Sequence, residues 1–267
     1  MASFIRTVRG GPTPEVDRYL LSYPKSGRTW LRALIGRALV ARFRLPEERL
    51  METEDLVRAA QLPSFAFDHD GSSMMDACKG RRLSPDKSAF RGKHVLLLGR
   101  DVRDTLVSAY FHATRRLGIY EGTISSFIRD ERYGADKVIA FYRQWFDARS
   151  VPRTFVFLRY EALHEDAPAA LRATLDFLGA RDVPASTIDD AIRFASFDNL
   201  RRAEAADAFR SASLRAANPA DPESYKVRRG KIGGYVDYLS PGDIAYIDER
   251  EAESGCGFAR PCRTPTE

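Results

Sequence analysis

Three short segments of the chain carry residue types that bind anions, and the first is "YPKSGRT". Lys25 supplies a positive charge, Ser26 and Thr29 supply hydroxyl donors, and Gly27 lets the backbone approach an oxyanion closely. A phosphate-binding P-loop has a glycine, four other residues and then Gly-Lys-Ser/Thr, whereas this lysine precedes its glycine. A tight turn with an exposed lysine is the ordinary alternative. The segment therefore indicates a phosphate-like anion without identifying it.

Two further segments could complete such a site. In "GRDVRDTLVSAY" Arg100 ends an apolar run and Ser108 follows two helical turns later, so both could reach one anion. "KVRRGKIGGYVDYLS" (226–240) places two arginines and three glycines in one loop. The alternatives are a solvated ion-pair cluster of the four charged residues within 100–104, and a solvated basic loop.

Continuous apolar runs that lead into helical spacing predict the elements that position these segments. The run at 18–24 precedes a helix that starts at Thr29 and ends at Leu45-Pro46. Further strands are expected at 64–71, 95–98 and 153–163. Unbroken apolar strands, each feeding a helix, are typical of a parallel sheet. We therefore predict an α/β fold: a single domain whose central parallel β-sheet is flanked by helices on both faces, with ligands beyond the carboxyl ends of the strands.

The expected domain covers residues 1–267. Within it we distinguish an N-terminal extension (1–17), a motif-bearing core (18–240) and a C-terminal helix and tail (241–267). Residues 72–92 lack periodicity and are expected to form a mobile loop.

Two helix starts are predicted in the last third of the chain. One helical segment should begin at a Ser186 or Thr187 cap. The last helix should begin with Ser240 as its cap, Pro241 at the first position and Asp243 in the first turn.

Composition narrows the class of function. The net charge of +5 weakly favours anionic ligands, but the cations are interleaved with acids, so a nucleic-acid partner is not expected. No metal is expected, because no histidines have metal-ligand spacing, and Cys256 and Cys262 are expected to be ordinary thiols. No apolar stretch has the length of a signal peptide or a membrane span, which predicts a cytoplasmic protein that does not associate with a membrane.

Taken together, "SYPKSGRTW", "GRDVRDTLVSAY" and "VRRGKIGGYVDYLS", with "FLRYEAL" and "FASFDNLRR" between them, resemble the signature segments of the cytosolic PAPS-dependent sulfotransferases. The resemblance spans about residues 18 to 240. It implies transfer of a sulfuryl group from 3′-phosphoadenosine 5′-phosphosulfate (PAPS) to a hydroxyl or amine, with a P-loop-like phosphosulfate-binding loop, PAPS as co-substrate and no metal. It also makes a bacterial source our expectation.

The resemblance implies a role for each matching residue. The phosphosulfate loop falls on Lys25 to Trp30: Lys25 would bridge the leaving oxygen and the sulfuryl group, and Trp30 would stack on adenine. The 5′-phosphate would be held by Ser26, Gly27 and Thr29. The 3′-phosphate would be held by Arg100, Ser108, Arg228, Arg229 and Gly230, and the adenine would lie near Tyr160 and Phe197.

Some positions depart from the family pattern. Arg28 replaces a frequent threonine within the phosphosulfate loop, and Val102 replaces a common proline. Gly234 stands where an acid is usual, and Tyr235 replaces a common tryptophan.

The candidate catalytic residues are Lys25, His69 and Ser108. His69 matches the family's histidine base by chain position, and its neighbours Asp68 and Asp70 are expected to raise its pKa. His94 and His112 are expected to be packed or surface residues.

The acceptor is expected to be a small, largely apolar molecule with a hydroxyl group. Ten side chains could line its pocket or belong to the core: Phe65, Phe67, Met74, Met75, Phe111, Tyr120, Phe141, Tyr142, Trp145 and Phe146. The alternatives for the function are an ATP-dependent small-molecule kinase and a non-catalytic module that binds anions or nucleic acid. A homodimer is possible, although no dimer motif is identified.

Overall fold

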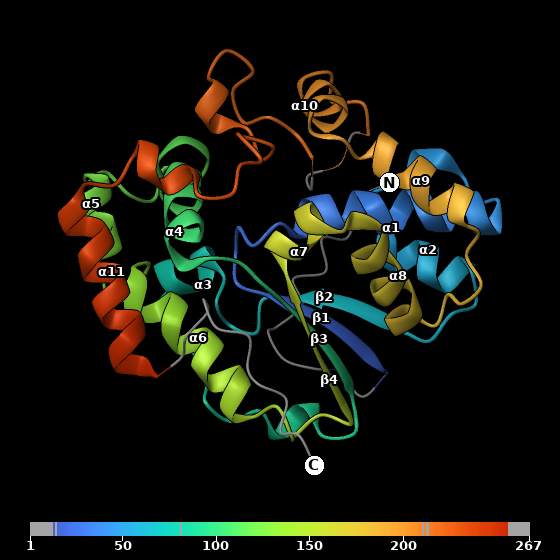
Figure 1. The fold of residues 1–267 in the computed structure, drawn as a ribbon, viewed down its shortest axis with the longest axis horizontal. Helices are drawn as coiled ribbons and strands as arrows, with labels where there is room; N and C mark the ends of the chain where they lie inside the picture. The colour runs from blue at the N-terminus through green and yellow to red at the C-terminus, as the bar shows by residue number, and fades with distance from the viewer. Residues whose placement is uncertain (1–12, 14, 81, 210, 212–213, 256–267) are drawn as a thin grey trace.

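Four parallel strands form the central sheet, in the order β2-β1-β3-β4 (Figure 1). The computed structural model describes residues 13, 15–80, 82–209, 211 and 214–255. Strand register places Leu20 of β1 opposite Leu96 of β3, and Leu96 opposite Val156 of β4. The strands are β1 (Arg18–Ser22), β2 (Phe65–Asp68), β3 (His94–Gly99) and β4 (Thr154–Arg159). The predicted α/β fold with a parallel sheet is confirmed.

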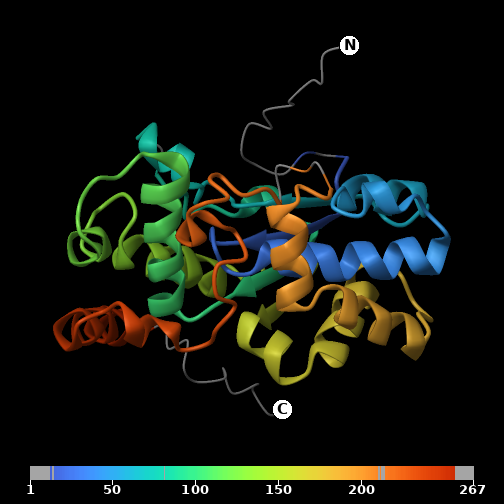
Figure 2. The same ribbon diagram turned by 90° about the horizontal axis from the view of Figure 1, so that it is seen from above.

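Alternate strand residues point into two separate cores, one on each face of the sheet. Leu20 and Leu96 belong to the first core, whereas Leu21 and Val95 belong to the second. Figures 1 and 2 show the helices that cover the two faces. The first core packs against α1 (Arg28–Phe43), α2 (Thr53–Ala59), α7 (Tyr160–Glu165), α8 (Ala167–Leu178), α9 (Ala185–Phe194) and α10 (Phe197–Ala205). The second packs against α3 (Met74–Cys78), α4 (Val102–Phe111), α5 (Ile124–Ile128), α6 (Ala135–Asp147) and α11 (Pro241–Ser254).

The start of α11 follows the predicted capping pattern. The Ser240 hydroxyl accepts a hydrogen bond from the Asp243 amide at 3.1 Å, and the Asp243 carboxylate accepts one from the Ser240 amide at 3.3 Å. Pro241 occupies the first position of the helix. This reciprocal arrangement satisfies two amides that would otherwise lack partners.

Residues 72–92 differ from the predicted loop. Ser73 caps α3 by accepting a hydrogen bond from the Asp76 amide at 3.0 Å, and Ser88–Phe90 form a 3₁₀ turn, η2. A helix of five residues is too short to produce the periodicity that the sequence analysis required.

Two other element boundaries also differ from expectation. The helical segment near residue 186 begins after Pro184 with no side-chain cap, so neither Ser186 nor Thr187 serves as one, and it is divided at Ala195-Ser196 into α9 and α10. The strand predicted at 153–163 ends at Arg159, because the residues that follow form α7.

The continuation of α4 is unusual. The π-helical segment η3 (His112–Leu117) follows it directly, and such segments are frequent at functional sites. In the described part of the chain no helix is long and apolar enough to cross a membrane. The thiols of Cys256 and Cys262, most of the predicted extension 1–17 and the tail from residue 256 lie outside the described residues.

Candidate active site

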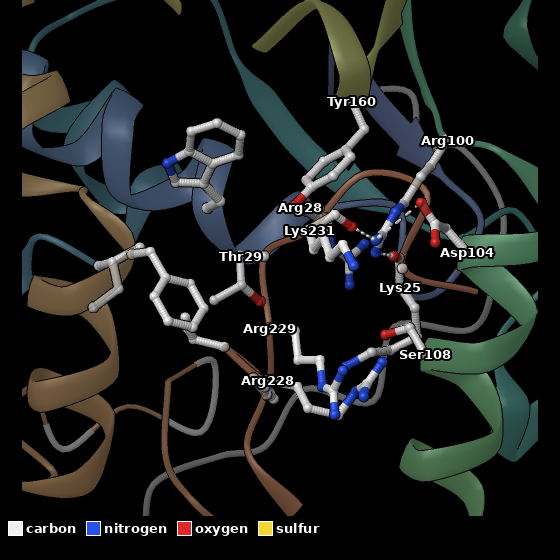
Figure 3. A pocket seen from close by; sticks show the side chains of 18 of the residues that line it. Lys25, Arg28, Thr29, Arg100, Asp104, Ser108, Tyr160, Arg228, Arg229 and Lys231 are labelled. Carbon is white, nitrogen blue, oxygen red and sulfur yellow. Dashed lines mark hydrogen bonds and ion pairs between the residues drawn. The ribbon is translucent and has the colours of Figure 1, made fainter. Parts of the chain in front are cut away.

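A cavity of about 370 Å³ lies beyond the carboxyl ends of the strands (Figure 3). His69, Arg100 and Tyr160 are the residues immediately after β2, β3 and β4, and Lys25 follows β1 by three positions. All four line the cavity, because parallel strands bring their carboxyl ends to the same edge. Every residue predicted to bind PAPS or to act in catalysis lines this cavity except Ser26.

The loop between β1 and α1 is built around Gly27. Its backbone is left-handed (φ 94°), and Gly27 occupies the cap position before α1, where no side chain accepts a hydrogen bond from the helix amides. The first amides of a helix lack intrahelical partners and attract anions, so this uncapped end is suited to an oxyanion. Lys25 also has a positive φ of 75°.

The Lys25 ammonium is placed where its charge is costly. Burial lowers its pKa to about 7, and the nearby charges of Lys226 and Arg116 act in the same direction, whereas Glu204 opposes them. An anionic ligand would favour the charged form, so the lysine is suited to bind a ligand that brings negative charge.

Arg100 joins the first anion-binding segment to the third. Its guanidinium donates hydrogen bonds to the Lys25 carbonyl at 3.3 Å and the Lys231 carbonyl at 3.2 Å, and lies 4.3 Å from the Tyr160 ring centroid (Figure 3). Its Nε is buried and has no hydrogen-bond partner. Ser108 lies on α4, with its side chain facing the same cavity (Figure 3).

Asp104 organises the late basic loop, a role that the sequence analysis missed. Its carboxylate is buried and accepts hydrogen bonds from the amides of Gly233 at 2.8 Å and Tyr235 at 3.0 Å, and it lies 3.8 Å from Arg100. The alternative of a solvated cluster is therefore wrong for Asp104, although Asp101 does pair with Arg103 near the surface.

The two arginines of the late loop are held by acids. Arg228 donates to Glu223 at 2.9 Å and to the Tyr238 hydroxyl at 2.7 Å, and Arg229 pairs with Asp237 at 2.9 Å. These contacts orient the guanidinium groups while leaving both residues on the cavity wall (Figure 3).

The predicted adenine-binding residues surround one side of the cavity. Phe197 is 40% exposed, and a side-chain carbon at Gly230 would lie 2.7 Å from its ring. The Trp30 indole donates a hydrogen bond to the Ala195 carbonyl at 3.0 Å and lies beside His164, with ring centroids 4.6 Å apart. Aromatic side chains that are held on a cavity wall in this way can stack on a base.

Ser26 points away from the cavity. Its hydroxyl lies 3.0 Å from the Tyr142 hydroxyl, and both side chains are buried. The expected contact between the Ser26 side chain and a 5′-phosphate is therefore not favoured.

His69 is held by two hydrogen bonds. Its Nδ1 lies 2.7 Å from the Ser22 carbonyl, and its Nε2 lies 2.6 Å from the Arg28 guanidinium. Because a carbonyl only accepts, Nδ1 carries the proton and Nε2 presents the lone pair. Burial and the Arg28 charge lower the pKa of His69 well below its usual range.

The expectation that two acids would raise the pKa of His69 is wrong. Asp68 accepts a hydrogen bond from the Asp70 amide at 2.6 Å, and Asp70 pairs with Lys87 at 2.5 Å. Their carboxylates are therefore engaged elsewhere, and the charge in direct contact with the imidazole is positive.

His112 is a further candidate site residue, which the sequence did not single out. It lines the cavity one turn beyond Ser108, and burial together with the Lys25 charge lowers its pKa to about 2. Lys226 and His164 also line the cavity and were not named. The spacing of four residues from Ser108 was the available signal for His112.

None of the ten apolar candidates for the acceptor pocket lines this cavity. Phe141, Tyr142 and Trp145 are fully buried in the second core, so the alternative of core packing holds for them. Met75 is exposed outside the cavity. In the described ranges no cluster of three histidine, cysteine or acidic side chains could hold a metal ion.

The fold and the site define an anion-binding protein of the α/β class, with an uncapped helix start and a basic cavity beyond the carboxyl ends of the strands. The chain belongs to the sulfotransferase domain family, whose model matches residues 16–254.

The comparisons with individual proteins agree with this assignment. Cytosolic sulfotransferase 17 of Arabidopsis thaliana is 23% identical, over 91% of this chain and 75% of that protein. Flavonol 3-sulfotransferase of Flaveria bidentis is 23% identical, over 87% of this chain and 80% of its own length. The solved structure of mouse sulfotransferase SULT7A1 with PAP has a TM-score of 0.61 at 20% identity, over 91% of this chain and 86% of that one, and shares its fold.

Proposed function

We propose that the chain transfers the sulfuryl group of PAPS to a hydroxyl group of a small molecule. The observation that carries the proposal is the placement of two anion-binding sets in one cavity: the Lys25–Thr29 loop, and the set formed by Arg100, Ser108, Arg228 and Arg229. PAPS carries a phosphosulfate and a separate 3′-phosphate, so it needs two such sets. The aromatic side chains of Trp30 and Phe197 line the same cavity and suit an adenine.

The proposed chemistry uses Lys25 and His69. Nε2 of His69 takes the proton of the acceptor hydroxyl while the acceptor oxygen forms a bond to sulfur. The bond between sulfur and the 5′-phosphate oxygen breaks, and its electron pair stays on that oxygen, which Lys25 stabilises. A preorganised donor aimed at developing charge contributes about 3 to 4 kcal/mol. Ser108 would assist by fixing the 3′-phosphate end.

The order of residues in the loop argues against the kinase alternative. Lys25 precedes Gly27, whereas the lysine of a nucleotide-binding P-loop follows its glycine. A thermal-shift comparison separates it from sulfuryl transfer. We expect adenosine 3′,5′-bisphosphate to stabilise the protein more than ATP with Mg²⁺ does. The reverse order would contradict the proposal, and salt-dependent retention of DNA or RNA without preference for a 3′-phosphate would indicate a non-catalytic binding module.

Three finer expectations accompany the proposal. The acceptor is a small hydroxylated molecule, the protein acts in the cytoplasm, as the relatives' name "cytosolic sulfotransferase" suggests, and the third expectation is a homodimer. Sedimentation analysis with and without adenosine 3′,5′-bisphosphate tests the last of these.

A further inference from the structure

Arg28 is directed at the candidate base. It is the first residue of α1, and its guanidinium donates to Nε2 of His69 at 2.6 Å. The other contact of this group is with the Phe67 ring, whose centroid lies 5.7 Å away. Arg28 therefore lies beside the reacting end of the cavity, although the resemblance places it in the phosphosulfate loop.

This hydrogen bond occupies the atom that a base must use. Because Nδ1 donates to the Ser22 carbonyl, Nε2 holds the lone pair of the imidazole. An acceptor hydroxyl can reach that lone pair only if the Arg28 guanidinium moves aside. An acceptor therefore displaces Arg28 from its hydrogen-bonded partner.

Arg28 forms no ion pair with a carboxylate in the described part of the chain. Across the described ranges, no carboxylate oxygen lies within 4.0 Å of its guanidinium, whereas Arg32, one turn along α1, pairs with Glu54 at 2.9 Å. Burial and the charge of Arg32 lower the pKa of Arg28 to about 10, although the charges of Glu54 and Asp68 act in the opposite direction, so it stays protonated at neutral pH. A half-buried charge that has no ion-pair partner is costly, and an anion on the incoming molecule would lower that cost.

We propose that Arg28 selects acceptors that carry an anionic group, such as a carboxylate, close to the reacting hydroxyl. This inference rests on the proposed function, because it takes His69 as the base. The proposal replaces the expected largely apolar acceptor with an acidic one. The acceptor hydroxyl takes the place of the Arg28 guanidinium on Nε2 of His69, and the displaced guanidinium binds the anionic group of the acceptor. Lys226, whose charge also reaches His69, adds to the positive potential there.

The test compares acids with their neutral counterparts. The probes are the three hydroxybenzoate isomers and their methyl esters, assayed with labelled PAPS for kcat/KM. For at least one isomer we expect the acid to be preferred by about tenfold or more, which corresponds to one charge-assisted hydrogen bond. Arg28→Gln should bring that ratio close to one, and Arg28→Lys should restore part of it.

Arg37→Gln is the matched control, because Arg37 lies on the same helix but pairs with Asp190 and Glu47 outside the cavity. It should keep the wild-type ratio. An unchanged acid-to-ester ratio in Arg28→Gln overturns the inference, as does a loss that lies wholly in the KM for PAPS, which would place Arg28 on the sulfuryl donor. Transfer to esters alone would preserve the proposed function while refuting the role of Arg28.

A binding measurement decides the case in which none of these probes is turned over. Calorimetric titration of each acid into the protein saturated with adenosine 3′,5′-bisphosphate should show weaker binding to Arg28→Gln than to the wild type, by about tenfold. Equal affinity for the two proteins would refute the inference.

Discussion

The backbone of Gly27 lies directly against the ring of Tyr160. A side-chain carbon at Gly27 would lie 2.7 Å from Cε2 of Tyr160 and still closer to Cδ2. The left-handed φ of 94° adds a second reason for glycine at this position. The start of α1 and the start of α7 therefore fit together only when residue 27 has no side chain.

Gly27→Ala should weaken the binding of adenosine 3′,5′-bisphosphate by at least about tenfold, because the loop or the Tyr160 ring has to move. Calorimetry measures the affinity. Gly92→Ala is the control, since Gly92 has a similar φ of 78° but open space around it. It should lower stability by about 1 to 2 kcal/mol and leave the affinity unchanged. Equal affinity in the two variants would show that the contact with Tyr160 is unimportant.

Replacing Asp104 should loosen the late loop. Asp104→Ala removes the acceptor of the Gly233 and Tyr235 amides, and leaving such groups without partners costs about 1 to 3 kcal/mol. We expect faster hydrogen exchange over residues 229–238 and weaker binding of adenosine 3′,5′-bisphosphate. Asp248→Ala, which removes a surface partner of Arg103, serves as the control. Unchanged exchange in Asp104→Ala would contradict the proposed role of this carboxylate.

Binding should be coupled to proton uptake by Lys25. Its pKa is lowered to about 7 in the free protein, and a bound anion raises it. Affinity is then highest below the free pKa and falls as the pH rises from about 7 toward the bound pKa. Calorimetry in two buffers with different ionisation heats measures the protons taken up.

Lys25→Arg is the control for this linkage, because an arginine remains charged throughout that range. The pH dependence should shrink in the variant. Identical proton uptake by the wild type and Lys25→Arg would assign the titration to another group.

Much of the fold was readable from the sequence because its strands are continuous apolar runs. Successive strand residues point alternately into two buried cores, as Leu20 and Leu96 do on one face of the sheet. Neither face of the sheet is polar, which indicates helices on both sides. The Ser240 cap was also predictable from local sequence, because its hydrogen-bond partners lie within four residues of it. The short helix α3 and the break between α9 and α10 were missed because neither produces a long periodic pattern.

The sequence indicated which residues form the site better than it indicated how their side chains are arranged. Lys25, Arg100 and Tyr160 follow strands, and the parallel sheet brings such residues together. The orientation of Ser26 toward Tyr142 depends on a residue 116 positions away, and the contact of His69 with Arg28 spans 41. Local sequence showed the two acids beside His69 but not where their carboxylates point.

The most direct test of sulfuryl transfer is the formation of labelled product from labelled PAPS by the wild type and by Lys25→Ala. We predict product with the wild type and a fall of about 100- to 1,000-fold in kcat for the variant, the loss expected when one preorganised donor is removed. Turnover by Lys25→Ala at the wild-type rate would contradict the account.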